Sequence, residues 1–454
     1  MLKDLADLIR IDSTRGEAKP GMPYGEGPAA AVAAAGEMME RYGLRVTDYD
    51  SIMIAGDLGP VERELDIIAH LDVVPVSEDW TVTAPFEPKV TDGKIYGRGA
   101  IDDKGPAVAA LYALRCVKEL GIPLKKGVRL LLGSNEECGS SDLRYYFQRE
   151  KPAPHTFSPD GDFPLINIEK ARLAGTLTAS WDKEEEAKDR RLVLLKGGSK
   201  ANVVPSSATL VVSGVPAGEA EAAAAEAGTL TGAEFTVDAA GEETRISVRG
   251  VPAHGSRPSD GVNAATAAFV LVRLLALTGP AAQAALSLGE LFPHGDTEGR
   301  ALGVAMSDEL SGALTMNLGV VSIADGELVA KIDCRAPLCA TDENLTDVFL
   351  ARLSSFGIAF SKKQMAPAHH VPEDDPFVKD LLACYESWTG EKGRPLAIGG
   401  WTYVHNIPGG VAFGCDTETD HHMHGDDEFV ETGLLAQSAK MFADAVVRIC
   451  GEEE

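Results

Sequence analysis

The sequence predicts an α/β fold built on a mostly parallel sheet, with a second, α+β domain inserted into the chain. Two apolar runs of strand length, ELDIIAHL over 64–71 and VRLLLGS over 128–134, are typical of strands buried on both faces. Between them, residues 105–121 are expected to form a helix, with Pro106 in its first turn and Gly121 past its end. This strand–helix–strand order indicates a βαβ unit, and therefore parallel strands with helices on both faces of the sheet.

The segments around these runs complete the first domain. Helices are expected over 1–12 and 28–42, and short extended segments over 45–57. Residues 87–96 are expected to form a hairpin with an Asp-Gly turn at 92–93.

The pattern changes after about residue 176. Segments such as ATLVVSGV and TRISVRG carry polar residues on one side, and helices are expected over 216–227, 262–278 and 343–356. These features are typical of an α+β domain with a half-exposed antiparallel sheet. A helix over 375–388 and a short strand over 410–414 then return to the first pattern.

A chain of 454 residues is too long for one ordinary core, so two domains are the natural expectation. We place residues 1–176 and 371–454 in one discontinuous domain and residues 177–370 in the inserted domain.

The composition excludes several classes of protein. A net charge of −27 argues against nucleic acid or an anionic membrane as a partner, and no apolar run reaches the length of a membrane span. The N-terminal segment carries charges throughout and has no signal-peptide pattern. The seven cysteines include no CxxC pair, which fits a reducing cytoplasm and predicts no thiolate zinc site. We therefore expect a cytoplasmic protein.

Acidic and histidine side chains follow three segments that are expected to be strands of one sheet. His70 and Asp72 follow the first, Asp102 and Asp103 the second, and the Glu136–Glu137 pair the third. Ligands bind at the carboxyl ends of strands in open α/β sheets. The sequence therefore predicts a carboxylate-rich metal site on the parallel sheet.

Five side chains from well-separated segments could build a centre for two metal ions: His70, Asp102, Glu137, Asp160 and His424. Two metals about 3.5–4 Å apart need a bridging ligand, for which a carboxylate has two oxygens, and Asp102 is the candidate. Taken singly, each piece also has an ordinary explanation, such as a helix cap at Asp102–Asp103.

Neighbouring residues are expected to support these ligands. Asp72 could accept the far imidazole N–H of His70. In an extended segment the side chains of Glu136 and Glu137 diverge, so Glu137 could bind metal while Glu136 acts as a general base. His421 and His422 are expected at the surface.

Six motifs together resemble the M20 metallopeptidase family, in its dipeptidase branch: AHLDVVP, YGRGAIDDKGP, SNEECGS, SPDGDFP, GVPAHGSRPSDGVNA and MHGDDEF. The resemblance spans nearly the whole chain. It implies a hydrolase with an α/β catalytic domain that carries two metals, here 1–176 with 371–454, and an inserted lid domain, here 177–370.

The resemblance also implies a role for each candidate. His70 and Asp160 would hold one metal, Glu137 and His424 the other, and Asp102 would bridge them. Asp72 would support His70, and Glu136 would be the general base. The Asp102–Asp103 peptide would be cis.

In the lid, the resemblance implies that His254 stabilises the oxyanion and that Asn202 helps to position the substrate. Arg335 would bind the substrate carboxylate, for which a guanidinium is well shaped. The stretch GGWTYVHNIPGGVAFG over 399–414 resembles the family's glycine-rich substrate loop and would contact the substrate through Gly399, Gly400 and Thr402. Trp401 and His405 depart from the family pattern, which has a third glycine and an arginine there. The bulky indole could narrow the pocket.

We therefore expect a dinuclear metallopeptidase that cleaves dipeptides with a free N-terminus, through a metal-bound hydroxide and the Glu136 base. Zinc is the expected metal, and manganese or cobalt also suit the oxygen-rich ligands. The partner is a small peptide substrate, and a monomer is expected. An alternative with the same machinery is an N-acyl or N-succinyl amino acid amidohydrolase. A third interpretation is a metal-stabilised binding protein or scaffold without catalysis.

Overall fold

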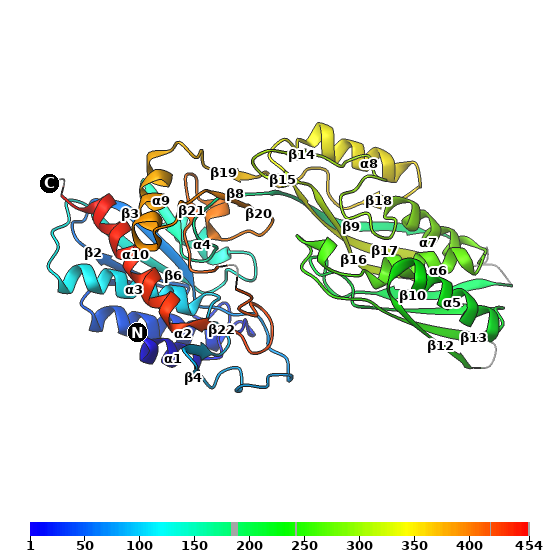
Figure 1. The fold of residues 1–454 in the computed structure, drawn as a ribbon, viewed down its shortest axis with the longest axis horizontal. Helices are drawn as coiled ribbons and strands as arrows, with labels where there is room; N and C mark the ends of the chain where they lie inside the picture. The colour runs from blue at the N-terminus through cyan, green and yellow to red at the C-terminus, as the bar shows by residue number, and fades with distance from the viewer. Residues whose placement is uncertain (183–188, 241–242, 418, 453–454) are drawn as a thin grey trace. The chain divides into compact units, whose positions relative to one another are not determined.

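The computed structural model describes residues 1–182, 189–240, 243–417 and 419–452 (Figure 1). The chain forms two compact units: unit 1 contains residues 1–169 and 369–454, and unit 2 contains residues 170–368. The first boundary lies earlier than the sequence placed it. The reason is that β9 (Ala171–Ser180) pairs with β17 (Glu327–Ala336) from its first residue to its last, so it belongs wholly to unit 2.

Unit 1 is organised around a mixed sheet in the order β1-β2-β6-β3-β7-β21-β8-β19, with β20 also on β8. The pairs β6–β3, β3–β7, β7–β21 and β8–β20 are parallel, and the other four pairs are antiparallel. The sheet is therefore mixed: its centre and the β8–β20 pair are parallel, as the sequence predicted for the strands around the βαβ unit, and the other pairs are antiparallel. A short turn joins β1 to β2, and strands joined in this way must run antiparallel. These strands are β1 (Arg45–Tyr49), β2 (Met53–Leu58), β3 (Arg63–His70), β6 (Gly127–Gly133), β7 (His155–Ser158), β8 (Ile166–Glu169), β19 (His369–His370), β20 (Leu396–Ile398) and β21 (Val411–Ala412).

Helices cover both faces of this sheet, as predicted. On β3, Leu65 and Ile67 point into a core with the helices α2, α3 and α10, whereas Ile68 points into a second core with α4. This alternation follows from the two-residue period of a strand. Figure 1 shows α3 and α10 side by side on the first face. The helices of unit 1 are α1 (Leu2–Ile9), α2 (Glu26–Arg41), α3 (Lys104–Glu119), α4 (Ser141–Phe147), α9 (Pro376–Thr389), α10 (Thr432–Cys450) and the 3-10 turn η4 (Tyr403–Asn406).

The segment that carries Asp102 differs from the prediction. The preceding strand, β5 (Lys94–Tyr96), is not part of the main sheet but pairs with β4 (Lys89–Thr91) and β22 (Phe429–Glu431). Asp102 lies in an irregular stretch directly before α3, whose N-cap is Asp103. Its position is therefore set by a loop and a helix start, because the sheet strand expected before it does not form.

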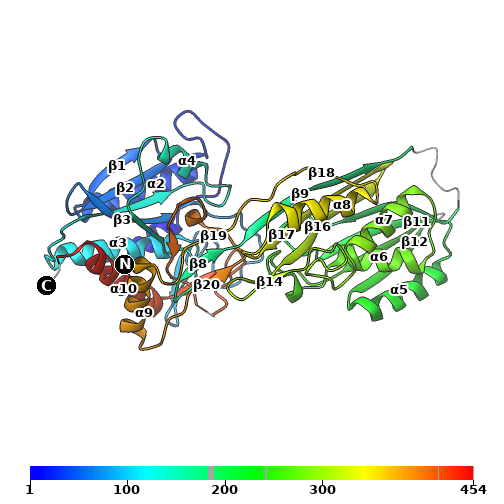
Figure 2. The same ribbon diagram turned by 90° about the horizontal axis from the view of Figure 1, so that it is seen from above.

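Unit 2 contains an antiparallel sheet of eight strands in the order β12-β13-β11-β10-β16-β17-β9-β18. Burial alternates strictly along β13, which confirms the half-exposed sheet. Four helices, α5 to α8, pack on one face (Figure 2). The bounds are β9 (Ala171–Ser180), β10 (Arg191–Gly197), β11 (Ser207–Ser213), β12 (Glu234–Ala240), β13 (Glu243–Arg249), β16 (Thr315–Ala324), β17 (Glu327–Ala336), β18 (Ala359–Phe360), the small pair β14 (Ser307–Asp308) and β15 (Gly312–Ala313), α5 (Ala217–Thr231), α6 (Ala264–Leu274), α7 (Pro280–Leu291), α8 (Asp347–Ser354), the 3-10 turn η2 (Pro258–Asp260) and the π turn η3 (Asp342–Thr346).

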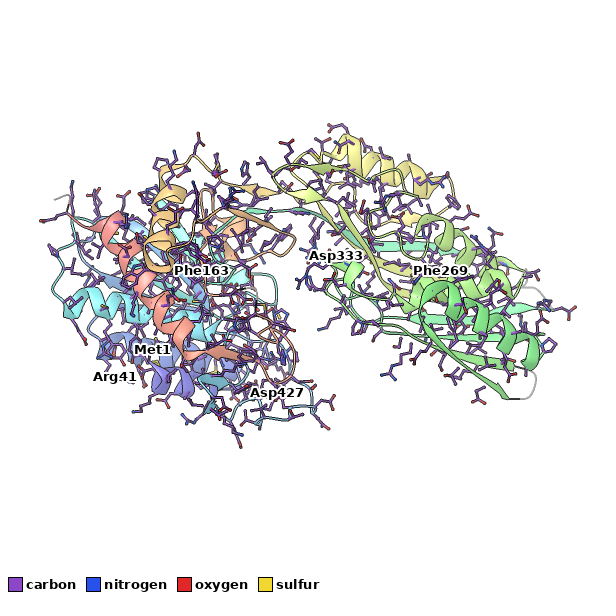
Figure 3. All side chains as sticks on the ribbon, in the orientation of Figure 1. Met1, Arg41, Phe163, Phe269, Asp333 and Asp427 are labelled. Carbon is purple, nitrogen blue, oxygen red and sulfur yellow. The ribbon has the colours of Figure 1, made fainter. Side chains whose placement is uncertain are left out.

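Each unit has a core of its own (Figure 3). In unit 1, Phe163 packs edge-on against Phe413, with ring centroids 5.3 Å apart. In unit 2, Phe269 of α6 lies within the cluster between helices and sheet. Among the described residues, no helix combines the length and the apolar character that crossing a membrane requires.

Candidate metal and catalytic site

Three adjacent parallel strands bring the predicted ligands to one edge of the sheet in unit 1. His70 is the last residue of β3, Asp160 follows the end of β7 by two residues, and Glu137 lies in the turn after β6. Because β6, β3 and β7 are neighbours and parallel, their carboxyl ends meet. The two remaining ligands, Asp102 and His424, come from loops outside the sheet.

Asp102 stands between two groups of these side chains. Its Oδ1 lies 3.0 Å from Nε2 of His70, which is also 3.7 Å from Oδ2 of Asp160. Its Oδ2 lies 2.7 Å from Nε2 of His424, which is also 3.1 Å from Oε1 of Glu137. The structure therefore brings all five predicted ligands together, and each oxygen of one carboxylate faces a different group.

The site contains far more negative than positive charge. Six carboxylates gather around His70 and His424, and within the described part of the chain no lysine or arginine forms an ion pair with any of them: Asp72, Asp102, Asp103, Glu136, Glu137 and Asp160. Asp72, Asp102 and Asp103 are buried, the other three are partly buried, and one oxygen of Asp103 has no hydrogen-bond partner. Buried charges need compensation. Carboxylate oxygens with imidazole nitrogens fit divalent cations such as zinc or manganese.

The protonation equilibria of the protein without cations reflect this crowding. Burial, opposed by His70 and reinforced by Glu137, raises the pKa of Glu136 well above its usual value. Burial also raises the pKa of Asp160 to about 7. At Asp102 burial acts in the same direction, but His424 and His70 outweigh it and hold the pKa of that carboxyl well below its usual range.

The support of His70 differs from the expectation. Its Nδ1 lies 2.9 Å from the backbone oxygen of Asp72, whereas the nearest carboxylate oxygen of Asp72 is 3.7 Å away. A carbonyl can only accept, so Nδ1 donates to it and Nε2 is the nitrogen directed at the site. The carboxylate of Asp72 instead accepts the backbone N–H groups of Glu136 and Glu137, at 3.0 and 3.1 Å. Asp72 therefore orients the turn that carries both glutamates. The Asp102–Asp103 peptide is cis, as the family resemblance implied.

Two residues that the sequence did not single out hold the loop ligands. The buried carboxylate of Glu428 accepts the backbone N–H groups of Gly99, Ile101 and, at 3.2 Å, Asp102. It also pairs with Arg98 at 2.6 Å, and Arg98 donates to the carbonyl of Gly425, next to His424. The Arg98–Glu428 pair thus ties the Asp102 loop to the His424 loop. The two residues lie in the GRGAID and HGDDEF motifs, but only the fold shows that they meet.

His421 is also placed differently from the prediction. It is 2% exposed rather than at the surface. Its two ring nitrogens lie 2.5 Å from Asp416 and 2.6 Å from Glu431, so it connects the start of the His424 loop to the start of α10. His422 is exposed, as expected.

The loop over 399–410 is anchored on Glu169, at the end of β8. Thr402 donates both its N–H and its hydroxyl to Glu169, at 3.0 and 2.9 Å, so its buried side chain positions the loop. His405 lies 3.0 Å from the other oxygen of Glu169 and stacks on Trp401, with ring centroids 3.7 Å apart. A Cβ on Gly400 would meet only Ile398, at 3.5 Å, so packing does not require a glycine there.

The remaining predicted residues lie in unit 2. Asn202 is half-buried, and His254 is exposed with its Nδ1 2.6 Å from the hydroxyl of Ser256. Arg335 is 4% exposed and holds Asp333 through Nε and Nη2. Arg172 binds the same carboxylate at 2.8 Å. Two guanidiniums therefore share one carboxylate.

The comparisons with known proteins agree with this architecture. The profile of peptidase family M20/M25/M40 matches residues 67–448, and the chain belongs to this family. It is therefore a metallopeptidase, an enzyme that hydrolyses peptide bonds in a metal-dependent reaction.

Two relatives are similar over essentially their whole length, and both are provisionally named dipeptidases. YtjP of Bacillus subtilis (strain 168) is 32% identical over 455 residues, which cover 99% of this chain and 97% of the relative. A protein of Staphylococcus aureus (strain USA300) is 30% identical over 472 residues, which cover 100% of this chain and 97% of the relative.

Solved structures show the same fold at low sequence identity. Human carnosine dipeptidase 1 has a TM-score of 0.59 at 14% identity, covering 99% of this chain and 95% of that chain. The dipeptidase Dug1p of Saccharomyces cerevisiae has a TM-score of 0.58 at 12% identity, covering 98% and 94%.

Proposed function

We propose that the protein is a dipeptidase that holds two divalent cations and acts on dipeptides with a free N-terminus. The observation that carries the two-cation proposal is Asp102, whose two oxygens face two separate ligand groups. His70 and Asp160 would complete one group, and His424 and Glu137 the other. The full-length similarity to relatives named dipeptidases supports the substrate class.

In the proposed reaction the cations and the side chains have different roles. When bound, the cations polarise the scissile carbonyl and lower the pKa of a water molecule. Glu136 accepts the proton of the attacking water and delivers it to the leaving amine. Asp72 holds the backbone of Glu136, which keeps this carboxylate beside the ligand groups.

Unit 2 supplies the groups that recognise the substrate. His254 donates a hydrogen bond to the oxyanion as charge develops on it, and Asn202 helps to place the scissile bond. Arg335 selects the terminal carboxylate. Asp333 holds the buried guanidinium of Arg335 in a fixed position, which supports this role. Gly399 and Gly400 let the loop approach the ligand.

A substrate panel after reconstitution with zinc, manganese or cobalt tests the proposal. We expect unblocked dipeptides such as L-alanyl-L-leucine to be cleaved, and N-acetylated dipeptides and N-acyl or N-succinyl amino acids to be poor substrates. Faster hydrolysis of the N-acyl compounds would replace the dipeptidase proposal with an amidohydrolase.

The Glu136→Gln variant tests the base within the same assay. A general base contributes about 10²–10⁴-fold, so we expect a loss of that size while metal analysis still finds two cations per chain. Normal turnover by a fully metallated variant would contradict the role of Glu136.

A further inference from the structure

We propose that Asn317 of β16 is a positioning residue that sets the geometry of both Asn202 and His254. The side-chain Nδ2 of Asn317 donates to the carbonyl of Ala201 at 2.8 Å and to the carbonyl of Val203 at 3.0 Å. These carbonyls flank Asn202 on either side. The amide of Asn317 has two N–H groups, one for each of these two carbonyls. The backbone is therefore held by hydrogen bonds on both sides of Asn202.

Backbone hydrogen bonds connect the segment that contains Asn202 to the segment that contains His254. Val203 forms a β-bridge with His254, the N–H of Gly255 donates to the carbonyl of Asn202 at 2.7 Å, and the N–H of Val204 donates to the carbonyl of Ala253 at 2.9 Å. Asn202 and His254 therefore lie on two loops that move together. A shift of one loop relative to β16 displaces both side chains.

The 201–203 segment is packed closely against β16 and against the segment that contains His254. A Cβ on Gly319, two residues after Asn317, would stand 2.2 Å from the carbonyl oxygen of Ala201. A Cβ on Gly255 would stand 2.9 Å from the backbone of Asn202. Both glycines are explained by the tight approach of the 201–203 segment to its neighbours.

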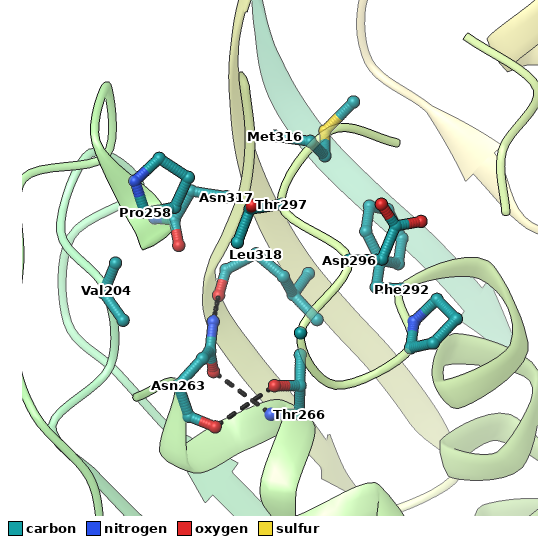
Figure 4. A pocket seen from close by; sticks show the side chains of 12 residues that line it. Val204, Pro258, Asn263, Thr266, Phe292, Asp296, Thr297, Met316, Asn317 and Leu318 are labelled. Carbon is teal, nitrogen blue, oxygen red and sulfur yellow. Dashed lines mark hydrogen bonds between the residues drawn. The ribbon is translucent and has the colours of Figure 1, made fainter. Parts of the chain in front are cut away.

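The acceptor side of the amide faces a different environment. Asn317 is 1% exposed, and its Oδ1 has no hydrogen-bond partner among the described residues. Asn317 and Val204 line a small cavity of about 30 Å³ behind the loop (Figure 4). A cavity of this size has room for about one water molecule, which such an oxygen could bind. The 201–203 loop is therefore held by the Nδ2 group of Asn317 and not by its Oδ1.

The sheet register links Asn317 to the third recognition residue. Asn317 stands opposite Asp333 in the β16–β17 pair, and Asp333 holds the guanidinium of Arg335. One strand pair thus organises Asn202, His254 and Arg335, which are far apart in the sequence.

The catalytic part of this inference rests on the proposed function, so the test has two independent measurements. The first is hydrogen exchange of the metal-loaded protein. In Asn317→Ala we expect faster exchange in segments 200–206 and 252–257 and unchanged exchange in unit 1. Asn263→Ala is the matched control, because among the described residues Asn263 caps α6 and donates to Leu318 but has no side-chain hydrogen bond to the 201–203 loop. Unchanged exchange in both segments of Asn317→Ala would overturn the proposal, whatever the enzyme does.

The second measurement is a double-mutant cycle on L-alanyl-L-leucine. A small displacement of positioning groups can cost about 10²-fold, so we expect kcat of Asn317→Ala to fall by about that factor. In a His254→Ala background the same change should cost less, because one of the two residues that Asn317 positions is already missing. An equal cost in both backgrounds would show a general structural role and overturn the proposal.

A second variant covers the case in which Asn317→Ala does not fold. Gly319→Ala pushes on the same loop from the other side and is expected to show the same exchange pattern and the same coupling to His254. If the wild-type protein cleaves no peptide, the proposed function fails, while hydrogen exchange still decides the role of Asn317.

Discussion

Unit 1 and unit 2 hold their predicted functional residues in different ways. In unit 1 the residues are charged, buried and mutually attached, with Asp102 between His70 and His424. In unit 2 Asn202 and His254 lie on loops and are positioned through their backbone, by Asn317 and by strand-like contacts. The predicted ligands of unit 1 are thus held by one another, whereas Asn202 and His254 are held through their backbone.

This difference predicts which property each unit governs. Loss of a ligand in unit 1 leaves buried carboxylates uncompensated, so it should affect cation binding and turnover together. Loss of a residue in unit 2 should leave the cations in place and change only turnover or substrate affinity.

Asp102→Asn should have the largest effect. An amide has one oxygen in place of two, so it cannot serve both ligand groups, and we expect loss of both cations. Turnover should fall by more than the roughly 10³-fold that follows loss of a single oxyanion donor. His424→Ala, which removes a ligand of one group only, should retain about one cation per chain by metal analysis. Two cations retained in Asp102→Asn would contradict the bridging role.

His254→Ala should lower kcat by about 10²–10³-fold, because it removes one donor to the oxyanion. Both cations should remain, in contrast to the ligand variants of unit 1. Ser256→Ala is the control: it removes only the hydroxyl beside Nδ1 of His254 and should cost much less. Loss of cations in His254→Ala would break the proposed division between the units.

Glu428→Gln should weaken cation binding by about 10–100-fold, since groups that orient ligands typically have effects of that size. The variant leaves Arg98 without its buried partner and disturbs the Asp102 loop. Competition with a chelator measures the affinity. Asp57→Asn breaks another arginine pair of unit 1, with Arg129, and should lower stability without changing cation affinity. Equal cation affinity in Glu428→Gln and the wild type would show that the loop keeps its place without this carboxylate.

Arg335→Met should have the smallest effect, an increase in KM of about tenfold, or about 1.4 kcal/mol. The increase should occur with L-alanyl-L-alanine and not with its C-terminal amide, which lacks the carboxylate. Arg335→Lys keeps the positive charge but not the planar guanidinium. Its KM for L-alanyl-L-alanine should therefore lie between the KM values of the wild type and of Arg335→Met. An equal KM increase for the acid and the amide would indicate that Arg335 only holds Asp333.

Much of the fold could be predicted because its signals are local. The apolar runs that became β3 and β6, the helix α3 between them and the alternating strand β13 each have a period visible in a few residues. The edges of the central sheet could not be predicted. The antiparallel pairing of β2 with β6 joins segments whose sequences look the same for either direction.

The chemistry of this protein could be read from its residue types and motifs: which carboxylates and imidazoles are present, and the motifs that contain Glu136, His254 and Arg335. How these side chains are held became visible in the folded chain alone. The attachment of Asp72 to the glutamate turn, of Glu428 to the Asp102 loop and of Asn317 to the Asn202 loop each joins segments that are distant in the chain. Side-chain type is a local property, whereas a hydrogen bond depends on two positions in space, and the folded backbone alone sets the distance between them.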